Sequence, residues 1–126
     1  METKKSILIV DDDPFLLKML DEILSGQGFL VQTARDGQEG LEKSRANHPD
    51  LILLDLVMPK MDGATMLEKL RDDEWGKTAA VIVLSNINNS ETIKALCAKN
   101  ARGYLVKVNN SLSDIAKVVN KFFATP

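Results

Sequence analysis

The sequence predicts an α/β protein built on a doubly wound parallel sheet, and two observations support that class. Short apolar runs alternate with segments of helical period along the chain, which is the pattern of βα units. Three of the apolar runs are nearly continuous, as expected for strands that helices cover on both faces. We count five repeats in one predicted domain, residues 1–126, with no stretch that resembles a linker.

Five apolar runs are predicted strands: Ser6–Val10, Leu30–Ala34, Leu51–Leu54, Ala80–Leu84 and Gly103–Val106. After the first strand, apolar residues recur at i, i+4, i+7 and i+8 from Leu16, which predicts a helix. Asp13 before Pro14 is typical of an N-cap followed by proline at the first helical position. Gly26 and Gly28 are expected to close this helix.

Weaker helical segments follow the next three strands, at Gly37–Ala46, Gly63–Arg71 and Asn88–Lys99. We interpret Gly63, after Asp62, as part of the turn that opens its helix. The last helix is predicted by apolar residues at helical spacing from Leu112 to Phe122. Ser111 directly precedes this helix, and Asp114 lies three residues further on, a spacing that resembles a capping box.

Composition and charge exclude several functional classes. Sixteen basic and eighteen acidic residues give a net charge of −2, and the basic residues are scattered, so direct nucleic-acid binding is not supported. A lone cysteine, Cys97, cannot form an intramolecular disulfide. Lys4 and Lys5 precede an apolar run too short for a signal peptide or a membrane span. We therefore expect a cytoplasmic protein without membrane insertion.

Polar residues follow the strands at the edge where ligands bind in doubly wound sheets. Asp11 and Asp12 come after the first strand, Asp55 after the third, Ser85 after the fourth and Lys107 after the fifth. If the first and third strands are neighbours, three carboxylates share one pocket, and each pair at about 4 Å would repel by about 4 kcal/mol at an effective dielectric of 20. Such an oxygen-rich site predicts Mg²⁺, and an added ammonium and hydroxyl group suit phosphoryl transfer.

Five segments, in order, resemble the receiver domain of two-component response regulators: ILIVDDDP, ARDGQEGL, PDLILLDLVMPKMDG, VIVLSN and GYLVK. The resemblance covers essentially the whole chain. It implies a flavodoxin-like (βα)₅ fold with strand order 2-1-3-4-5. It also implies a phosphorelay signalling protein that is not an enzyme in the ordinary sense, although it assists its own phosphorylation and dephosphorylation.

The resemblance assigns a role to each acidic residue. Asp55 would accept a phosphoryl group from a phosphohistidine on a sensor histidine kinase or a phosphotransfer protein. Asp12 and Asp55 would bind Mg²⁺ directly, while Asp11 would act through water and the backbone carbonyl of Val57 would be a further ligand.

Two other groups of residues would sense and transmit the phosphorylation. Lys107 would bind the phosphoryl oxygens, and Ser85 would shift toward them as Tyr104 turns inward. The surface of residues 88–99, 103–106 and 112–122 would then change and signal to a downstream protein or a fused output domain. Tyr104 also has a purely structural interpretation, as a tyrosine half-packed near a sheet edge. Whether phosphorylation drives dimerisation stays open.

Three positions depart from the family pattern. Receivers usually carry proline after the lysine, joined by a cis bond, whereas here Val108 follows Lys107. A cis bond before a non-proline residue costs about 2.5 to 4 kcal/mol, so the geometry of this loop does not follow from the resemblance. Val57 is apolar and would not help to position a hydrolytic water, which predicts a long-lived acylphosphate. The third departure is small, since Ser85 stands where threonine is also common.

Two alternative functions compete with the receiver hypothesis. Asp11-x-Asp13 together with Ser85 and Lys107 resembles the haloacid-dehalogenase phosphatase pattern, with Asp11 as the nucleophile and Asp13 as the acid. That pattern expects an acidic pair beyond the lysine, and only Asp114 follows here. A pseudo-receiver used purely for protein binding is the other alternative, and the intact acidic set argues against it. Helix capping alone would explain Asp13.

Overall fold

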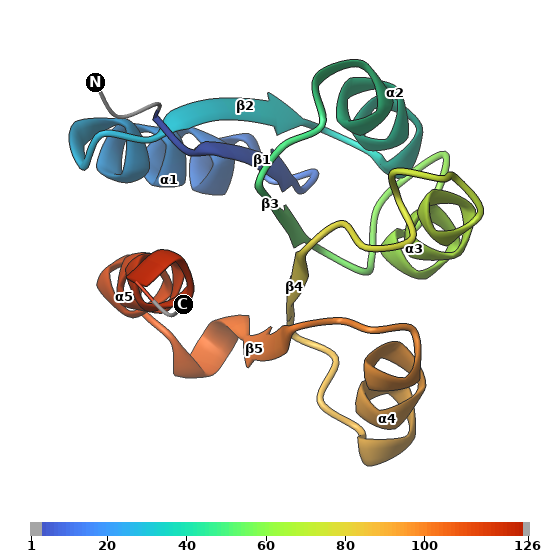
Figure 1. The fold of residues 1–126 in the computed structure, drawn as a ribbon. Coiled ribbons are helices and arrows are strands. Elements are labelled where there is room, and N and C mark those ends of the chain that lie inside the picture. Colours follow the sequence, from blue (N-terminus) through green and yellow to red (C-terminus); the bar gives the residue numbers. More distant parts are fainter. Residues whose placement is uncertain (1–3, 125–126) are drawn as a thin grey trace.

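The computed structural model describes residues 4–124, which form a five-stranded parallel sheet in the order β2-β1-β3-β4-β5 (Figure 1). The strands are β1 (Ser6–Val10), β2 (Leu30–Ala34), β3 (Leu51–Leu54), β4 (Val81–Ser85) and β5 (Gly103–Val106). The α/β class and the strand order that the resemblance implied are thereby confirmed. The first three and last two residues of the predicted domain lie outside the described residues.

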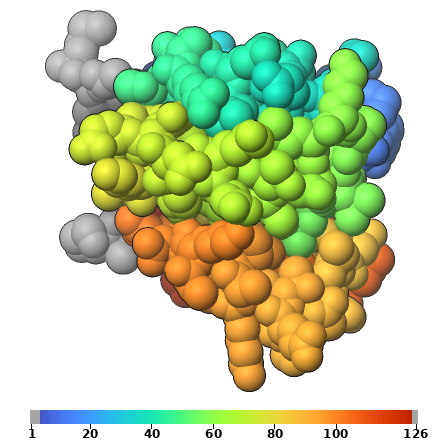
Figure 2. All heavy atoms as spheres, turned by 90° about the vertical axis from the view of Figure 1, so that its right-hand side faces the viewer, coloured from blue at the N-terminus to red at the C-terminus, as the bar shows by residue number. Residues whose placement is uncertain are grey.

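Five helices cover the two faces of the sheet: α1 (Pro14–Gly26), α2 (Gly37–Asn47), α3 (Gly63–Arg71), α4 (Ser90–Ala98) and α5 (Leu112–Ala124). Helices α1 and α5 pack on one face, and α2, α3 and α4 pack on the other (Figure 1). Figure 2 shows the second side, with α2, α3 and α4 in successive bands. Side chains of the central strands alternate between the two cores, which are both closed to water.

The helix ends follow the capping chemistry that the sequence indicated. The Asp13 carboxylate accepts a hydrogen bond from Phe15 N at 3.0 Å, and α1 ends at Gly26. In the capping box, Asp114 N donates to Ser111 Oγ at 3.1 Å and Ser111 N donates to Asp114 Oδ2 at 2.9 Å. The hydrogen bond from Ser111 N favours the charged carboxylate and lowers the pKa of Asp114.

The structure corrects the sequence prediction at the fourth and fifth βα units. Strand β4 starts and ends one residue later than expected, so that Ser85 is its last residue and pairs with Val106 of β5. Helix α4 starts at Ser90, because the Asn89 side chain caps it by accepting from Thr92 N at 2.8 Å. A short 3₁₀ turn, η1 (Lys107–Asn109), was not predicted. Across residues 4–124 we find no helix with the length and apolarity needed to cross a membrane.

Candidate functional site

Strand pairing brings the three acidic residues to one edge of the sheet. Val10 at the end of β1 pairs with Leu54 at the end of β3, so Asp11 and Asp55 emerge side by side. The backbone reinforces this register, because Asp55 N donates to the Val10 carbonyl at 2.9 Å. Carboxylate oxygens of Asp11, Asp12 and Asp55 all lie within 4.8 Å of one another.

Two of the three carboxylates in this cluster are buried, and burial disfavours their charged form. The exposed fractions of Asp11 and Asp55 are 1% and 6%, whereas Asp12 is exposed. Backbone amides satisfy one oxygen of each buried carboxylate: Asp13 N donates to Asp11 Oδ1 at 2.9 Å, and Leu56 N donates to Asp55 Oδ1 at 2.8 Å. Burial raises the pKa of Asp11, and repulsion from Asp55 adds to that effect, while Lys107 and the Asp13 amide oppose it.

Lys107 supplies the positive charge that faces the cluster. Its Nζ lies 2.6 Å from Asp11 Oδ2 and 3.3 Å from Asp55 Oδ2, and its side chain is 21% exposed. Burial disfavours the ammonium form, but the two carboxylates outweigh burial and the pKa of Lys107 is raised. Residues 4–124 contain no cis peptide bond. Lys107 therefore reaches the site from a trans bond to Val108 and a 3₁₀ turn.

The donor set fits a hard divalent cation. Every candidate ligand is an oxygen, as Mg²⁺ prefers, and exposed Asp12 keeps one side of the cluster open to solvent. Among the described residues, Asp11 Oδ2 is buried and accepts no hydrogen bond of regular geometry, and the Lys107 ammonium lies 2.6 Å from it. A cation beside this cluster would relieve that deficit.

A cleft of about 280 Å³ adjoins the acidic cluster on the side of β4 and β5. Its lining residues are Asp55, Val57, Ser85, Asn86, Ile87 and Lys107. Ser85 is buried, and its Oγ accepts from Ile87 N at 3.3 Å and also interacts with the hydroxyl of Tyr104. The cleft thus presents the carboxylate, the hydroxyl and the ammonium group that the sequence singled out.

Tyr104 lies against the loop that follows Ser85. Its hydroxyl donates a hydrogen bond to the carbonyl of Ile87, and burial raises its pKa. The side chain is half-buried and packs on the core beneath α4. This arrangement agrees with the structural interpretation of Tyr104, and its switching role stays a prediction.

Sequence reasoning missed the reason for Gly63. Its predicted place in the turn that opens α3 is confirmed, since Asp62 caps the helix by accepting from Thr65 N at 2.8 Å. A Cβ at position 63, however, would lie 2.0 Å from the carbonyl oxygen of Asp55. Glycine lets α3 begin directly against the backbone of the candidate acceptor. A DG pair shortly after a strand-ending aspartate is the signal that could have indicated this.

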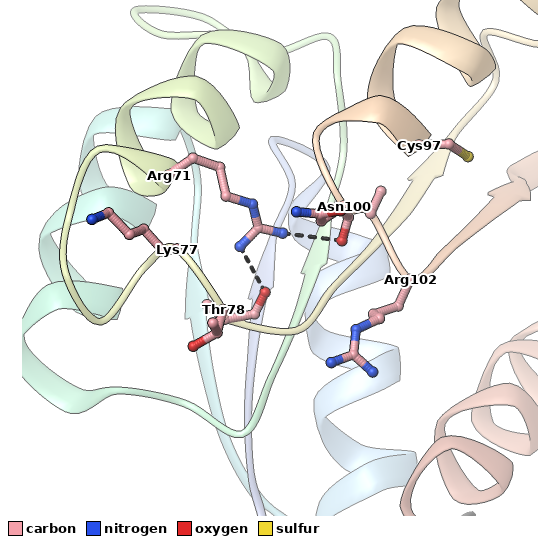
Figure 3. A pocket seen from close by; sticks show the side chains of 8 residues that line it. Arg71, Lys77, Thr78, Cys97, Asn100 and Arg102 are labelled. Atoms are coloured by element: carbon pink, nitrogen blue, oxygen red, sulfur yellow. Dashed lines mark hydrogen bonds between the residues drawn. The ribbon is translucent and has the colours of Figure 1, made fainter.

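A second hollow, of about 340 Å³, lies at the opposite ends of the strands, between the loops that precede β4 and β5 (Figure 3). The Arg71 guanidinium reaches into it and donates to four carbonyl oxygens, those of Gly76, Ala79, Lys99 and Asn100, at 2.7 to 3.2 Å. These contacts tie two loops to the end of α3. We assign Arg71 a structural role.

Two aromatic residues lie at that same end of the molecule. His48 forms the C-cap of α2 with a φ of 46°. Its ring stacks on Trp75, with ring centroids 4.4 Å apart and an interplanar angle of 6°. Because they precede β3 and β4 instead of following them, neither residue belongs to the acidic cluster.

The model of the response regulator receiver domain family matches residues 7–120. The chain belongs to this family. A curated receiver relative, the chemotaxis protein CheY of Treponema pallidum, is 41% identical over 80% of this chain and 71% of its own length. CheY of Halobacterium salinarum is 31% identical over 88% of this chain and 96% of its own length.

Solved receiver structures share the fold closely. CheY4 of Vibrio cholerae superimposes with a TM-score of 0.86 and 28% identity, covering 94% of this chain and 98% of that one. CheY in the CheX–CheY–BeF₃–Mg complex of Borrelia burgdorferi gives a TM-score of 0.85 and 33% identity, covering 94% and 89%. Receiver domains are signalling domains that bind Mg²⁺ at an acidic cluster and interact with histidine kinases and downstream targets.

Some relatives are much longer than this chain. It spans 8% of hybrid signal transduction histidine kinase D of Dictyostelium discoideum, and 44% of the probable C4-dicarboxylate response regulator DctR of Halalkalibacterium halodurans. Receiver domains therefore occur both as compact proteins and as parts of longer ones, and the family alone does not specify the output of this chain.

Proposed function

We propose that residues 1–126 act as one cytoplasmic receiver domain in which Asp55 accepts a phosphoryl group from a phosphohistidine. The donor would be a sensor histidine kinase or a phosphotransfer protein, and the reaction would depend on Mg²⁺. One observation carries the proposal: Asp55 Oδ2 lies 3.3 Å from the Lys107 ammonium at the edge of a three-carboxylate cluster. This combination supplies a nucleophile and a cation for the phosphoryl oxygens.

The two oxygens of Asp55 have different surroundings. Oδ1 accepts a hydrogen bond from Leu56 N, which orients the carboxylate, while Oδ2 faces Lys107 and the cleft. We infer that Oδ2 attacks phosphorus as the bond from phosphorus to the histidine nitrogen breaks and imidazole leaves. Lys107 would stabilise two of the charged phosphoryl oxygens, and the Ser85 hydroxyl would donate to another.

The metal would be held by Asp12 and Asp55 directly, by Asp11 through water and by the backbone carbonyl of Val57. When bound, Mg²⁺ supplies charge neutralisation for the transferring group. Asp11 would also hold Lys107 in place, because their charged atoms lie 2.6 Å apart. After transfer, Lys107 would turn from the carboxylates toward the phosphoryl oxygens.

Phosphorylation would be read out on the surface of α4, β5 and α5. The hydrogen bonds of Ile87 to Ser85 and Tyr104 join the reacting cleft to β5, so a shift of Ser85 would be felt by Tyr104. The downstream partner would be a separate protein or a fused output domain. Phe15 in the first turn of α1 is 69% exposed, and Val57 and Val108, which follow β3 and β5, are 63% and 77% exposed. These side chains offer apolar contacts to a phosphodonor.

Intact mass spectrometry after incubation with acetyl phosphate and Mg²⁺ tests the proposal on the wild type, Asp55→Asn and Asp11→Asn. We expect one phosphoryl adduct on the wild type and none on Asp55→Asn, while Asp11→Asn loads more slowly. Steady hydrolysis that is lost in Asp11→Asn and kept in Asp55→Asn would instead support the phosphatase alternative. The capping role of Asp13, which accepts from Phe15 N and Leu16 N, argues against it as a catalytic acid.

A further inference from the structure

Asn86 joins the segment that follows Ser85 to the turn that carries Lys107. Its Oδ1 accepts a hydrogen bond from Val108 N at 3.0 Å, across 22 positions of the sequence. Asn86 directly follows Ser85 and lines the cleft beside Asp55, while Val108 directly follows Lys107. The bond therefore spans the site between the end of β4, which carries Ser85, and the turn η1, which carries Lys107.

Little else restrains the backbone at Val108. It is the middle residue of the 3₁₀ turn η1, whose first N–H groups have no partner within the turn. Its side chain is 77% exposed, so packing adds little. The neighbouring Asn110 side chain donates to the Val106 carbonyl at 2.9 Å, but this bond stays within its own loop. Beyond the pairing of Ser85 with Val106, the Asn86 side chain is the contact that links the Val108 amide to the segment after β4.

Ser85, by contrast, is held firmly. It is buried at the end of β4 and pairs with Val106. The hydrogen bond from Val108 N to Asn86 therefore fixes the backbone next to Lys107 relative to the buried end of β4. The lysine side chain has four flexible torsions, so a fixed backbone origin narrows the positions that its ammonium group can reach.

We propose that Asn86 is a positioning residue for phosphoryl transfer, which holds the Lys107 backbone at the distance from Ser85 and Asp55 that the reaction needs. This inference rests on the proposed function of Asp55. The hydrogen bond to Asn86 is possible because residue 108 is valine, since a proline at that position would have no N–H to donate.

The test compares Asn86→Ala with Asn110→Ala, a matched control in the adjacent loop. In Asn86→Ala we expect the Val108 amide to exchange with water at least threefold faster by NMR, as one modest hydrogen bond is lost. The rate of phosphorylation by phosphoramidate should fall about threefold, with Mg²⁺ affinity by calorimetry unchanged. Asn110→Ala should leave all three quantities near wild type, and Asn86→Asp, which keeps the acceptor oxygen, should keep the amide protected.

A second comparison uses Val108→Pro, which removes the donor instead of the acceptor. Because one bond is at stake, Asn86→Ala should have almost no further effect on the phosphorylation rate in the Val108→Pro background. Unchanged Val108 exchange in Asn86→Ala, an unchanged phosphorylation rate, or a parallel loss of Mg²⁺ affinity would each overturn the positioning role. If the wild type takes up no phosphoryl group, the proposed function fails first, whereas normal loading of both wild type and Asn86→Ala removes only this inference.

Discussion

Replacing Lys107 with methionine should destabilise the metal-free fold and do so in a pH-dependent way. The change keeps an unbranched side chain but removes the ammonium group that lies 2.6 Å from Asp11 Oδ2. At an effective dielectric of 20, contacts of 2.6 and 3.3 Å correspond to about 6 and 5 kcal/mol of gross attraction. The net loss of stability is much smaller than this gross attraction, because the variant also avoids the free-energy cost of removing the lysine ammonium from water.

Removing one partner of a buried ion pair typically costs about 3 to 5 kcal/mol. Lys107 is 21% exposed, so solvent screens part of its charge, and we expect a loss of about 2 to 3 kcal/mol in the free energy of unfolding. For a domain of this length, that loss lowers Tm by about 8 to 12 °C. Thermal unfolding followed by circular dichroism in EDTA measures it directly.

The sign of the pH dependence follows from Asp11. Burial raises its pKa, so the folded state binds more protons than the unfolded state at pH values above the ordinary 3.8, and the free energy of unfolding falls as pH rises through that window. Without Lys107 the pKa should rise further. The deficit of the variant relative to wild type should therefore be largest near pH 8 and shrink near pH 5. Excess Mg²⁺ should also shrink it.

Lys60→Met is the matched control, because Lys60 is 75% exposed and lies 3.8 Å from Asp36. Such a surface pair contributes about 0 to 1 kcal/mol, so Tm should barely move. A Lys107→Met variant whose Tm falls by no more than that of the control, or by the same amount at both pH values, would refute this electrostatic reasoning.

Three further variants test separate parts of the structure. Val57→Asn should speed loss of the phosphoryl group by about two- to tenfold, since a side chain able to hold a water by one hydrogen bond replaces an apolar one, and unchanged or slower dephosphorylation counts against this view. Asp13→Ala should lower the free energy of unfolding in urea by about 1 kcal/mol through loss of the α1 cap, with Mg²⁺ affinity unchanged; weaker Mg²⁺ binding would contradict a pure capping role. Arg71→Met should cost about 2 to 4 kcal/mol by the same urea assay, and complete rescue by Arg71→Lys would refute the idea that several carbonyls need a branched donor.

Much of the fold could be predicted from sequence because its local signals agree with one another. Short apolar runs predicted β1, β2, β3 and β5 with the bounds observed. The end of β4 was wrong by one residue, since Ser85 is polar but still pairs with Val106, and hydrophobicity does not report such pairing. The strand order came from the resemblance, because periodicity leaves several doubly wound orders open.

The candidate site was predictable in its residues but not in its contacts. Residues that follow strands share one edge of a parallel sheet, which was enough to single out Asp11, Asp12, Asp55 and Lys107. The 3₁₀ turn after β5 and the Asn86 hydrogen bond could not be predicted, because both depend on how two loops meet in space. Gly63 was likewise interpreted as a local turn residue, although the nearby carbonyl of Asp55 is what requires it.

The location of the phosphoryl group is the most direct test of the account. Borohydride reduces an aspartyl phosphate to homoserine and leaves free aspartate intact, so peptide mass spectrometry after loading identifies the acceptor. We expect homoserine at position 55 alone, and only when both acetyl phosphate and Mg²⁺ are supplied. Homoserine at position 11, or none at any position, would contradict the assignment of Asp55 as the acceptor.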